Sequence, residues 1–287
     1  MNKTIYMTYK KEIPDKVADR WKQLNPSYAI DFSLDHDCIH FLRTYFNEYI
    51  ANLFISIPEG MYKADLWRLC KLYVHGGVYA DVDLVPHVNL DTLDKSVDFY
   101  SCLSVVKDSI FQAFMVNYSK PKNPLFYVFL LSFLLNHPYT KTNGPTYDMF
   151  YCLRYMIRKP IRPHEKYEFV VRIKITIGSS QTPVKHIPLH YFPIFPSIQI
   201  KLHKHPFPEQ FSIVIQNHML IVTRTDASTG WDHSHAIDIL FNKTSMMLFE
   251  EHWGERDRIE TCYVTHFNTK ILDSRDADFV NHQWVLQ

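Results

Sequence analysis

The apolar and polar positions of the first hundred residues follow strand and helix periods in turn. Residues 3–9 (KTIYMTY) and 28–34 (YAIDFSL) are short runs rich in β-branched and aromatic side chains, which are typical of strands. Between them, residues 15–25 carry apolar positions at helical spacing, and residues 35–54 and 59–75 do the same. The order strand, helix, strand, helix, strand predicts an α/β domain with a mixed, mostly parallel central sheet flanked by helices.

The pattern changes after residue 98. Two β-rich runs, 98–106 and 110–119, predict an antiparallel pair, and helical spacing returns near 123–136 and 145–158. Beyond Pro160 the chain is rich in proline and aromatic residues, and only short strands are predicted. Since no internal repeat or linker interrupts the pattern, we expect one domain over 1–287, with a ligand-binding core in 1–150 and a second part of the same domain in 151–287.

Composition narrows the function classes. With 46% hydrophobic residues and a formal net charge of +1, the chain has the material for a large core and lacks the basic excess of a nucleic-acid binder. Its five cysteines are scattered and form no C-x-x-C pair, which favours a reducing compartment. No signal-peptide pattern and no apolar run long enough to span a bilayer occur, so we expect a cytoplasmic protein without a transmembrane segment.

The most informative stretch is 64–86, ADLWRLCKLYVHGGVYADVDLVP. On a helix over 59–75, Asp65 and Arg68 lie three residues apart and are therefore neighbours, either as an ion pair or facing a cleft. Two glycines suit the end of that helix, and the short strand after them delivers Asp81 and Asp83 at its carboxyl end. Ligands of open α/β sheets bind at that edge.

Two carboxylates that flank one apolar residue suit a hard divalent cation. Mg²⁺ and Mn²⁺ take one or two protein carboxylates and leave positions for substrate phosphates. Alone, an Asp-x-Asp tripeptide is also compatible with a polar turn after a strand. The context of Ala-Asp-x-x-Arg, a helix, and Gly-Gly-x-Tyr-x-Asp-x-Asp is what favours the cation site.

This stretch resembles the sugar-nucleotide-binding core of family-32 glycosyltransferases and of the related large clostridial glucosylating toxins. The opening residues 5–30, the segment 111–130 and the TNGP turn at 142–145 resemble further parts of that family. The resemblance covers about residues 3–150 and implies a fold of the GT-A type. It also implies a metal-dependent, retaining transfer of a hexose from a nucleotide-diphosphate sugar, UDP-linked or GDP-mannose, to the hydroxyl of a glycan, lipid-linked or protein acceptor.

The resemblance implies a role for each matching residue. Asp83 would ligate Mn²⁺ or Mg²⁺, while Asp81 would hold donor hydroxyls and contact the metal through water. Asp65 and Arg68 would bind the transferred sugar, and Thr8 and Tyr9 would contact the nucleotide, with Tyr9 as the platform for the base in place of the family's usual tryptophan. Further donor contacts are expected from these residues: Tyr79, which also suits the core, and Asn143, which also suits a helix cap.

The metal needs ligands beyond the aspartate pair, and the family supplies them from a late segment that ends in tryptophan. The best candidate here is TRTDASTGWDHSH at 223–235, which assigns Asp226 and Ser228 to the metal and Trp231 to the leaving phosphate. The segment around Trp253 is the alternative. His233 and His235 form an H-x-H pair without an evident third ligand, which is more typical of a solvated loop than of a zinc site.

Two other classes of function stay open at this point. Asp81-Val82-Asp83-Leu84-Val85 also spells the D-x-D-x-V nucleophile signature of haloacid-dehalogenase-like phosphatases, although it follows a helix and two glycines instead of an unbroken strand. A sugar-binding module that has lost transfer is the third class. Because no nucleophilic carboxylate is evident, the pattern favours attack on the same face of the sugar over a double displacement.

Overall fold

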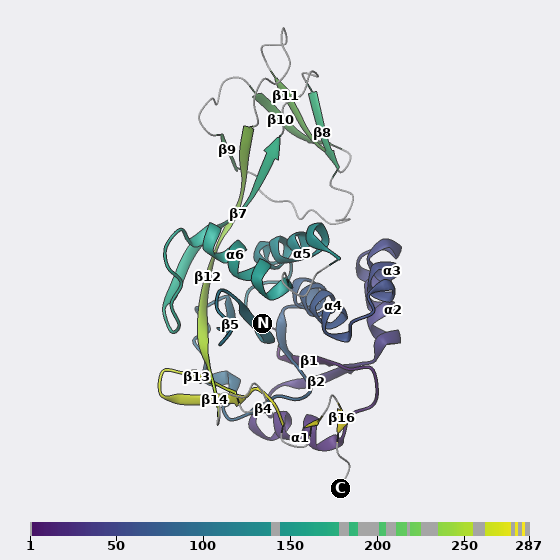
Figure 1. The fold of residues 1–287 in the computed structure, drawn as a ribbon, viewed down its shortest axis with the longest axis vertical. Helices are drawn as coiled ribbons and strands as arrows, with labels where there is room; N and C mark the ends of the chain where they lie inside the picture. Colours follow the sequence, from purple (N-terminus) through teal and green to yellow (C-terminus); the bar gives the residue numbers. More distant parts are fainter. Residues whose placement is uncertain are drawn as a thin grey trace.

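The computed structural model describes residues 2–138, 144–177, 184–188, 201–204, 211–216, 219–224, 235–254, 262–276, 279–280 and 283–284. Figure 1 shows the arrangement of its helices and strands. A mixed sheet runs through the molecule, and most of the helices cover one of its faces. The sheet matters for function because its strand order decides which chain segments meet at one edge.

The parallel part of the sheet comes from the first eighty residues. The strands β1 (Thr4–Thr8), β2 (Ala29–Ser33) and β3 (Gly77–Ala80) lie in the order β2-β1-β3, and all three are parallel. Crossover helices make this possible, since parallel neighbours need a long connection. Their carboxyl ends therefore meet at one edge.

Among the described residues, five α-helices flank the sheet on one face and one flanks it on the other. α1 (Asp15–Leu24) lies alone against the second face, with Val17 and Trp21 buried. The others share the first face: α2 (Asp35–Tyr45), α3 (Glu48–Ser56), α4 (Gly60–His75), α5 (Pro124–Asn136) and α6 (Pro145–Ile157). The predicted helices over 59–75, 123–136 and 145–158 are confirmed to within a residue or so, while the pattern over 35–54 is broken into α2 and α3.

The sheet has a hydrophobic core on each face, and successive side chains of a strand alternate between the two cores. In β1, Tyr6 belongs to the core under α2–α6, whereas Ile5 and Met7 belong to the core on the α1 side. Successive strand residues point to opposite faces, so one strand feeds both cores. Such strands read as apolar throughout, which is why the first strand shows no polar alternation.

The rest of the sheet is antiparallel except for one pair. β6 (Ile110–Asn117) pairs with β3 and with β5 (Phe99–Leu103), and β5 lies parallel to β12 (His235–His252). The predicted antiparallel pair after residue 98 is thus confirmed. The sheet is mixed as predicted but not mostly parallel, because hairpins and β12 add antiparallel neighbours.

The sheet curls until its late strands return to the aspartate pair. β12 pairs with β13 (Tyr263–His266), β13 with β14 (Thr269–Asp273), and β14 with β4 (Val85–Pro86), which begins two residues after Asp83. The C-terminal quarter of the chain therefore reaches the segment that carries the D-x-D motif. The sequence pattern had not indicated this closure.

At its other end the sheet continues as two long paired strands, β12 and β7 (Lys166–Ile177). β7 pairs with β12 along most of its length, and β9 (Lys201–Lys204) pairs with the same strand. β10 (Phe211–Gln216), β11 (Met219–Arg224) and β8 (Val184–Pro188) form a separate antiparallel sheet, drawn at the far end of these strands in Figure 1. The strands predicted after Pro160 are present, and β7 is longer than expected. A last pair consists of β15 (Phe279–Val280) and β16 (Gln283–Trp284).

The two glycines between α4 and β3 are required by the backbone. Gly76 has φ +65° and Gly77 has φ +91°, values that other residues adopt only with strain. A Cβ on Gly77 would lie 2.8 Å from the carbonyl oxygen of Thr4, on the neighbouring strand. The pair turns the chain from helix to strand within two residues.

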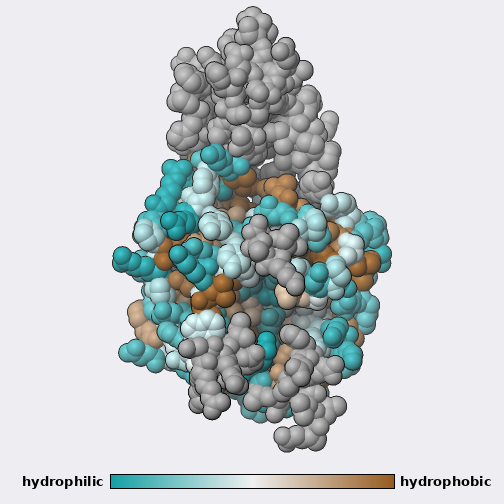
Figure 2. Space-filling view, in the orientation of Figure 1, coloured by the Kyte–Doolittle hydropathy of each residue, from teal (hydrophilic) through white to brown (hydrophobic). Residues whose placement is uncertain are grey.

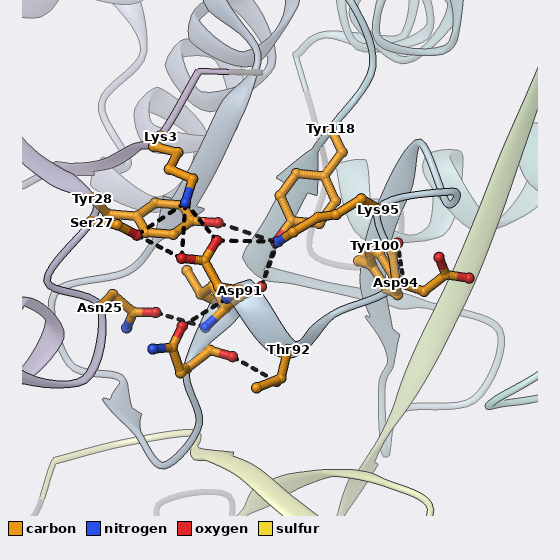
Figure 3. A network of polar contacts seen from close by, with 12 residues as sticks. Lys3, Asn25, Ser27, Tyr28, Asp91, Thr92, Asp94, Lys95, Tyr100 and Tyr118 are labelled. Carbon is orange, nitrogen blue, oxygen red and sulfur yellow. Dashed lines mark hydrogen bonds and ion pairs between the residues drawn. The ribbon is translucent and has the colours of Figure 1, made fainter.

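A polar network ties the amino end of β1 to the segment after β4 (Figure 3). Asp91, in the short 3₁₀ helix Leu90–Thr92, accepts from Lys3 and from Ser27. The ammonium of Lys95 donates to the hydroxyl of Tyr118 at 3.0 Å and lies 4.2 Å from that ring. These contacts fix the sheet end opposite the aspartate pair.

The surface of the described residues mixes polar and apolar side chains. On the face in Figure 2, hydrophobic residues form small patches separated by hydrophilic ones. None of the helices in the described part of the chain combines the length and apolarity that crossing a bilayer requires. The apolar helix α5 is buried against α4 and α6 instead.

Candidate active site

The candidate site lies at the carboxyl edge of the parallel strands. Thr8 ends β1, Ser33 ends β2, and Asp81 follows β3 directly. The amide of Asp81 donates to the carbonyl of Ala113 on β6 at 2.8 Å, which continues the sheet past the end of β3. The aspartate pair therefore follows the carboxyl end of β3, as predicted. This is the edge at which α/β sheets bind ligands.

Arg68 joins α4 to the aspartate pair. Its guanidinium lies 3.3 Å from Oδ1 of Asp65 and 3.4 Å from Oδ1 of Asp81, and it stacks 4.4 Å over the ring of Tyr79. Arg68 and Asp65 are both buried, whereas the side chain of Asp81 is 31% exposed. The structure therefore brings together three of the predicted residues, with Asp81 facing outward.

The fully buried Tyr79 positions Asp81. Its hydroxyl donates to Oδ1 of Asp81 at 2.5 Å, and its ring packs between Arg68 and Trp67. The sequence suited Tyr79 either to the core or to the donor site. The structure buries its ring in the core, and its hydroxyl reaches the site.

Burial raises the pKa of two other carboxylates of the site, Asp65 and Asp83. Burial raises the pKa of Asp65 to about 6, although Arg68 favours its charged form. Burial also raises the pKa of Asp83 to about 7; the charge of Asp81 adds to the shift, and Arg275 opposes it. The site thus concentrates negative charge in a poorly solvated place, which is typical of sites that bind cations or activate protons.

A C-terminal turn covers Asp83. Nε of Arg275 lies 3.6 Å from Oδ2 of Asp83, and the amide of Asp276 donates to the carbonyl of Asp83 at 2.5 Å. Asp276 is buried and forms an ion pair with Arg20 of α1. Arg275 and Asp276 were missed from sequence, since no local motif links residues so far along the chain.

Tyr9 and Thr8 lie at the neighbouring strand end. The ring of Tyr9 makes an edge contact with Phe279 at 5.9 Å between centroids, and burial together with the charge of Asp83 raises its pKa. The hydroxyl of Thr8 donates to the carbonyl of Ser33 at 2.8 Å. Tyr9 is therefore close enough to Asp83 for that charge to act on its hydroxyl, and the Thr8 hydroxyl joins β1 to β2. The nucleotide contacts expected of both residues stay predictions.

Gln112 on β6, next to Ala113, is a buried polar residue that sequence reasoning did not single out. It is 2% exposed, yet neither its amide nitrogen nor its amide oxygen has a hydrogen-bond partner among the described residues. By strand alternation it shares a face with Ile110, which packs in the core with Tyr79 and α4. Its neighbour Ala113 accepts from the Asp81 amide. A lone polar residue at an inward strand position was the available signal.

The other predicted site residues lie outside the described residues. These are the donor-binding candidates Asn143 and Trp231 and the metal candidates Asp226 and Ser228. The alternative tryptophan, Trp253, is described: it follows β12 and is 44% exposed.

The donor set of the aspartate pair fits a divalent cation that is completed by a ligand. Nowhere in the described ranges do three or more His, Cys, Asp or Glu side chains gather in a way that could hold a metal by themselves. Mg²⁺ and Mn²⁺ need fewer, since one or two carboxylates plus phosphates and water complete their shell. Burial and, to a smaller extent, the charge of Asp81 raise the pKa of Asp83 to about 7, and a cation at this carboxylate would favour its charged form.

Comparisons with known proteins agree with this site. Residues 13–100 match the family described as "Glycosyltransferase sugar-binding region containing DXD motif", and Asp81 and Asp83 fall inside the match. The predicted resemblance is confirmed over residues 13–100, where the chain is similar to the DXD-containing sugar-binding region of glycosyltransferases.

One curated relative is "Putative glycosyltransferase HOC1" of Saccharomyces cerevisiae, which is 37% identical over 81 residues. That alignment covers 26% of this chain and 20% of the yeast protein, so the chain matches about a fifth of its relative. Among solved structures, "PaToxG Glycosyltransferase" aligns with a TM-score of 0.41 and 17% identity, over 54% of this chain and 69% of that one.

Proposed function

We propose that the protein is a metal-dependent, retaining hexosyltransferase that uses a nucleotide-diphosphate sugar, with UDP-sugars favoured over GDP-mannose. The observation that carries this proposal is the cluster of Asp65, Arg68, Asp81 and Asp83 at the carboxyl edge of the parallel strands, inside the segment that matches the DXD sugar-binding region. The same match favours transfer over the phosphatase suggested by the D-x-D-x-V spelling.

Each residue has a role that its position supports. Asp83 and Asp81 would hold Mn²⁺ or Mg²⁺, and the metal, when bound, would neutralise charge on the leaving diphosphate. Asp65 and Arg68 offer an acceptor and a donor to the hydroxyls of the transferred hexose, and Gln112 offers one of each. Tyr9 offers its ring to the nucleotide base.

The reaction exchanges one bond to the anomeric carbon for another. The bond from that carbon to the β-phosphate oxygen breaks with its electron pair on the diphosphate, and the acceptor hydroxyl oxygen forms the new bond. The hydroxyl proton passes to the leaving diphosphate. Because Arg68 is held on both sides by carboxylates, its positive charge stays fixed near the reacting sugar and needs little reorganisation.

Arg275 would change partners in this scheme. Its Nε lies 3.6 Å from the Asp83 carboxylate and would compete with a cation for that oxygen. A diphosphate brings its own negative charge to the same place, so Arg275 can pair with phosphate oxygens once the carboxylates hold the metal.

Thermal unfolding with UDP-glucose, UDP-galactose and GDP-mannose, each with and without Mn²⁺, tests the proposal. A ligand that binds only the folded protein raises the melting temperature, and we expect the rise to need the metal and a donor together. Asp83→Asn should abolish that rise and lower donor turnover by about 10²–10³-fold, the usual cost of removing one transition-state contact. Asp19→Asn, at an exposed carboxylate on α1, is the matched control. Full turnover by Asp83→Asn would refute the assignment.

A further inference from the structure

A cavity opens at the same edge of the sheet as the aspartate pair. Its volume is about 360 Å³, and it is lined by Leu103, Ser104, Val105, Pro163 and the residues from Glu250 to Trp253. β5 is parallel to β12, and both run in the direction of β3, because β6 is antiparallel to β3 and to β5. The ends of β5 and β12 that line this cavity are therefore carboxyl ends, as is the end of β3 at Asp81.

Strand order relates the cavity to the aspartate pair. In the order β3-β6-β5-β12, three strand spacings separate β3 from β12, about 14 Å along a flat sheet. An oligosaccharide of a few residues bridges such a length. The cavity is thus placed where an acceptor could extend away from the reacting hydroxyl.

The side chains at its rim suit a carbohydrate. Trp253 presents a ring that is 44% exposed, and Glu250 beside it is 43% exposed at its side chain. Two imidazoles lie near the same carboxylate oxygen, Oε2 of Glu250: His252 at 3.7 Å and His164 at 3.5 Å. A pyranose has an apolar face that packs on an indole and a rim of hydroxyls that both donate and accept, so carboxylate and imidazole groups at the ring edge recognise it.

The negative charge of the residues that line the cavity disfavours binding of a nucleotide or a phosphate. A second nucleotide or phosphate would meet Glu250 and Glu251 without a lysine or arginine among the residues that line the cavity. A neutral, hydroxyl-rich ligand meets no such repulsion. The volume, at the low end of ligand cavities, fits one or two sugar rings.

One buried carboxylate links this cavity to the aspartate pair. Glu251 accepts from Ser104 Oγ at 2.9 Å and from the Val105 amide at 3.0 Å, both in the loop that lines the cavity. Its other oxygen accepts from Ser274 Oγ at 3.2 Å, and Ser274 precedes Arg275, the residue beside Asp83. The cavity wall and the turn over the aspartate pair are therefore held by the same side chain.

From this juxtaposition we infer that the cavity between the 103–105 loop and the end of β12 is an acceptor subsite for a glycan, with Trp253 as its sugar platform and Glu250 as a hydroxyl ligand. The inference rests on the proposed transferase function. It adds the substrate class, a carbohydrate acceptor, and the residues that recognise it.

Binding is tested without turnover by ¹⁹F NMR on the full chain labelled with 5-fluorotryptophan. Trp253→Phe assigns the resonance of Trp253 among the five tryptophans. The probes are maltose, cellobiose, lactose, mannobiose and N,N′-diacetylchitobiose. We expect at least one disaccharide to shift the Trp253 resonance, and Glu250→Gln to weaken its binding by about tenfold, as for the loss of one good contact.

Kinetics separate an acceptor subsite from a structural role. For the disaccharide that binds, Trp253→Ala should raise the acceptor KM by roughly tenfold and should lower transfer to the disaccharide more than hydrolysis of the donor by water. Tyr151→Ala removes another exposed aromatic ring, on α6, and should change neither quantity. Equal loss of transfer and hydrolysis in Trp253→Ala overturns the inference.

The two proposals fail in different ways. If the wild-type protein hydrolyses a nucleotide sugar but no disaccharide shifts the Trp253 resonance, the acceptor subsite is wrong and the transferase function stands. If a disaccharide shifts that resonance but no nucleotide sugar is hydrolysed, the transferase function is wrong, and the cavity is a sugar site that serves no transfer.

Discussion

At the scale of single residues, the site depends on one buried arginine. The guanidinium of Arg68 is 4% exposed and lies within 3.4 Å of a carboxylate oxygen from both Asp65 and Asp81. Burial disfavours its charge, but the neighbouring carboxylates more than offset this and raise its pKa. Removing it would leave two carboxylates without their shared partner.

Arg68→Met should therefore destabilise the fold as well as the site. Breaking a buried ion pair from one side costs about 3–5 kcal/mol, and we expect a loss of that size in the free energy of unfolding measured with urea. Arg43→Met is the control, because Arg43 pairs with Glu48 at the exposed surface, where solvent screens the pair and its contribution to stability is small. Similar urea midpoints for the two variants would contradict a shared role for Arg68.

The raised pKa of Asp83 predicts an unusual pH dependence. Its pKa in the folded protein, about 7, is above the ordinary value of 3.8, so between these values the folded state binds more protons than the unfolded state. Without metal, this group makes the free energy of unfolding fall as pH rises from about 4 to 7, by at most about 1.4 kcal/mol for each pH unit.

Urea unfolding in the presence of a chelator, repeated across this pH range, checks the sign. Asp83→Asn should flatten the dependence, because the amide does not titrate, while Asp65, with its pKa raised to about 6, keeps a smaller slope of the same sign. Mn²⁺ should stabilise the wild type most above pH 7, where the carboxylate is already deprotonated. An identical slope in wild type and Asp83→Asn would show that Asp83 is not the titrating group.

Residue spacing predicted the two aspartates of the D-x-D motif and the Asp65–Arg68 pair, and it missed the residues that surround them. The i,i+3 relation of Asp65 and Arg68 and the two aspartates after a strand are local patterns, and the structure brings three of these residues into contact. Arg275 reaches the site because β14 pairs with β4, and local spacing does not encode such pairing. For Gln112, the buried amide without a partner became visible only in the folded chain.

At the scale of elements, the turn from α4 into β3 sets where the aspartates lie. Gly77→Ala should cost more than about 2 kcal/mol, because a positive φ is strained for alanine and the new Cβ would meet the Thr4 carbonyl at 2.8 Å. Gly60→Ala, at the first residue of the same helix, has nothing within 4 Å of its Cβ and should be neutral or stabilising by about 0.5–1 kcal/mol. Thermal or urea unfolding of the two variants compares them directly.

Helices were easier to predict than strand pairing. The helices over 59–75, 123–136 and 145–158 were predicted nearly residue by residue, since their periodicity and their glycine and proline boundaries are local. The predicted excess of parallel strands was wrong, because the direction of each later strand depends on its partner and not on its own pattern.

At the scale of the whole molecule, closure of the curled sheet completes the site. β14 pairs with β4 and places the 274–276 turn over Asp83, and the ion pair of Asp276 with Arg20 holds that turn against α1. These contacts join the two ends of the sequence. The turn that covers Asp83 carries no recognisable motif, whereas the predicted ligand segment 223–235 has a visible tryptophan motif and stays a prediction.

Glu251 tests whether this closure matters for donor binding. Its carboxylate is buried, burial raises its pKa, and it accepts from Ser104, Val105 and Ser274 at once. Glu251→Ala leaves these donors without their partner and should cost about 1–3 kcal/mol of stability for each buried group that stays unsatisfied. Because the 274–276 turn then loses an anchor, the donor with Mn²⁺ should also raise the melting temperature less than in wild type.

Ser104→Ala is the matched control for that experiment. It removes a contact of Glu251 on the loop side and leaves the Ser274 contact intact, so it should lower stability modestly and keep the full response to donor. A donor response that falls equally in both variants would assign the effect to general destabilisation. A response that falls only in Glu251→Ala would show that the C-terminal turn is part of the donor site, since the two variants differ in the contact to that turn.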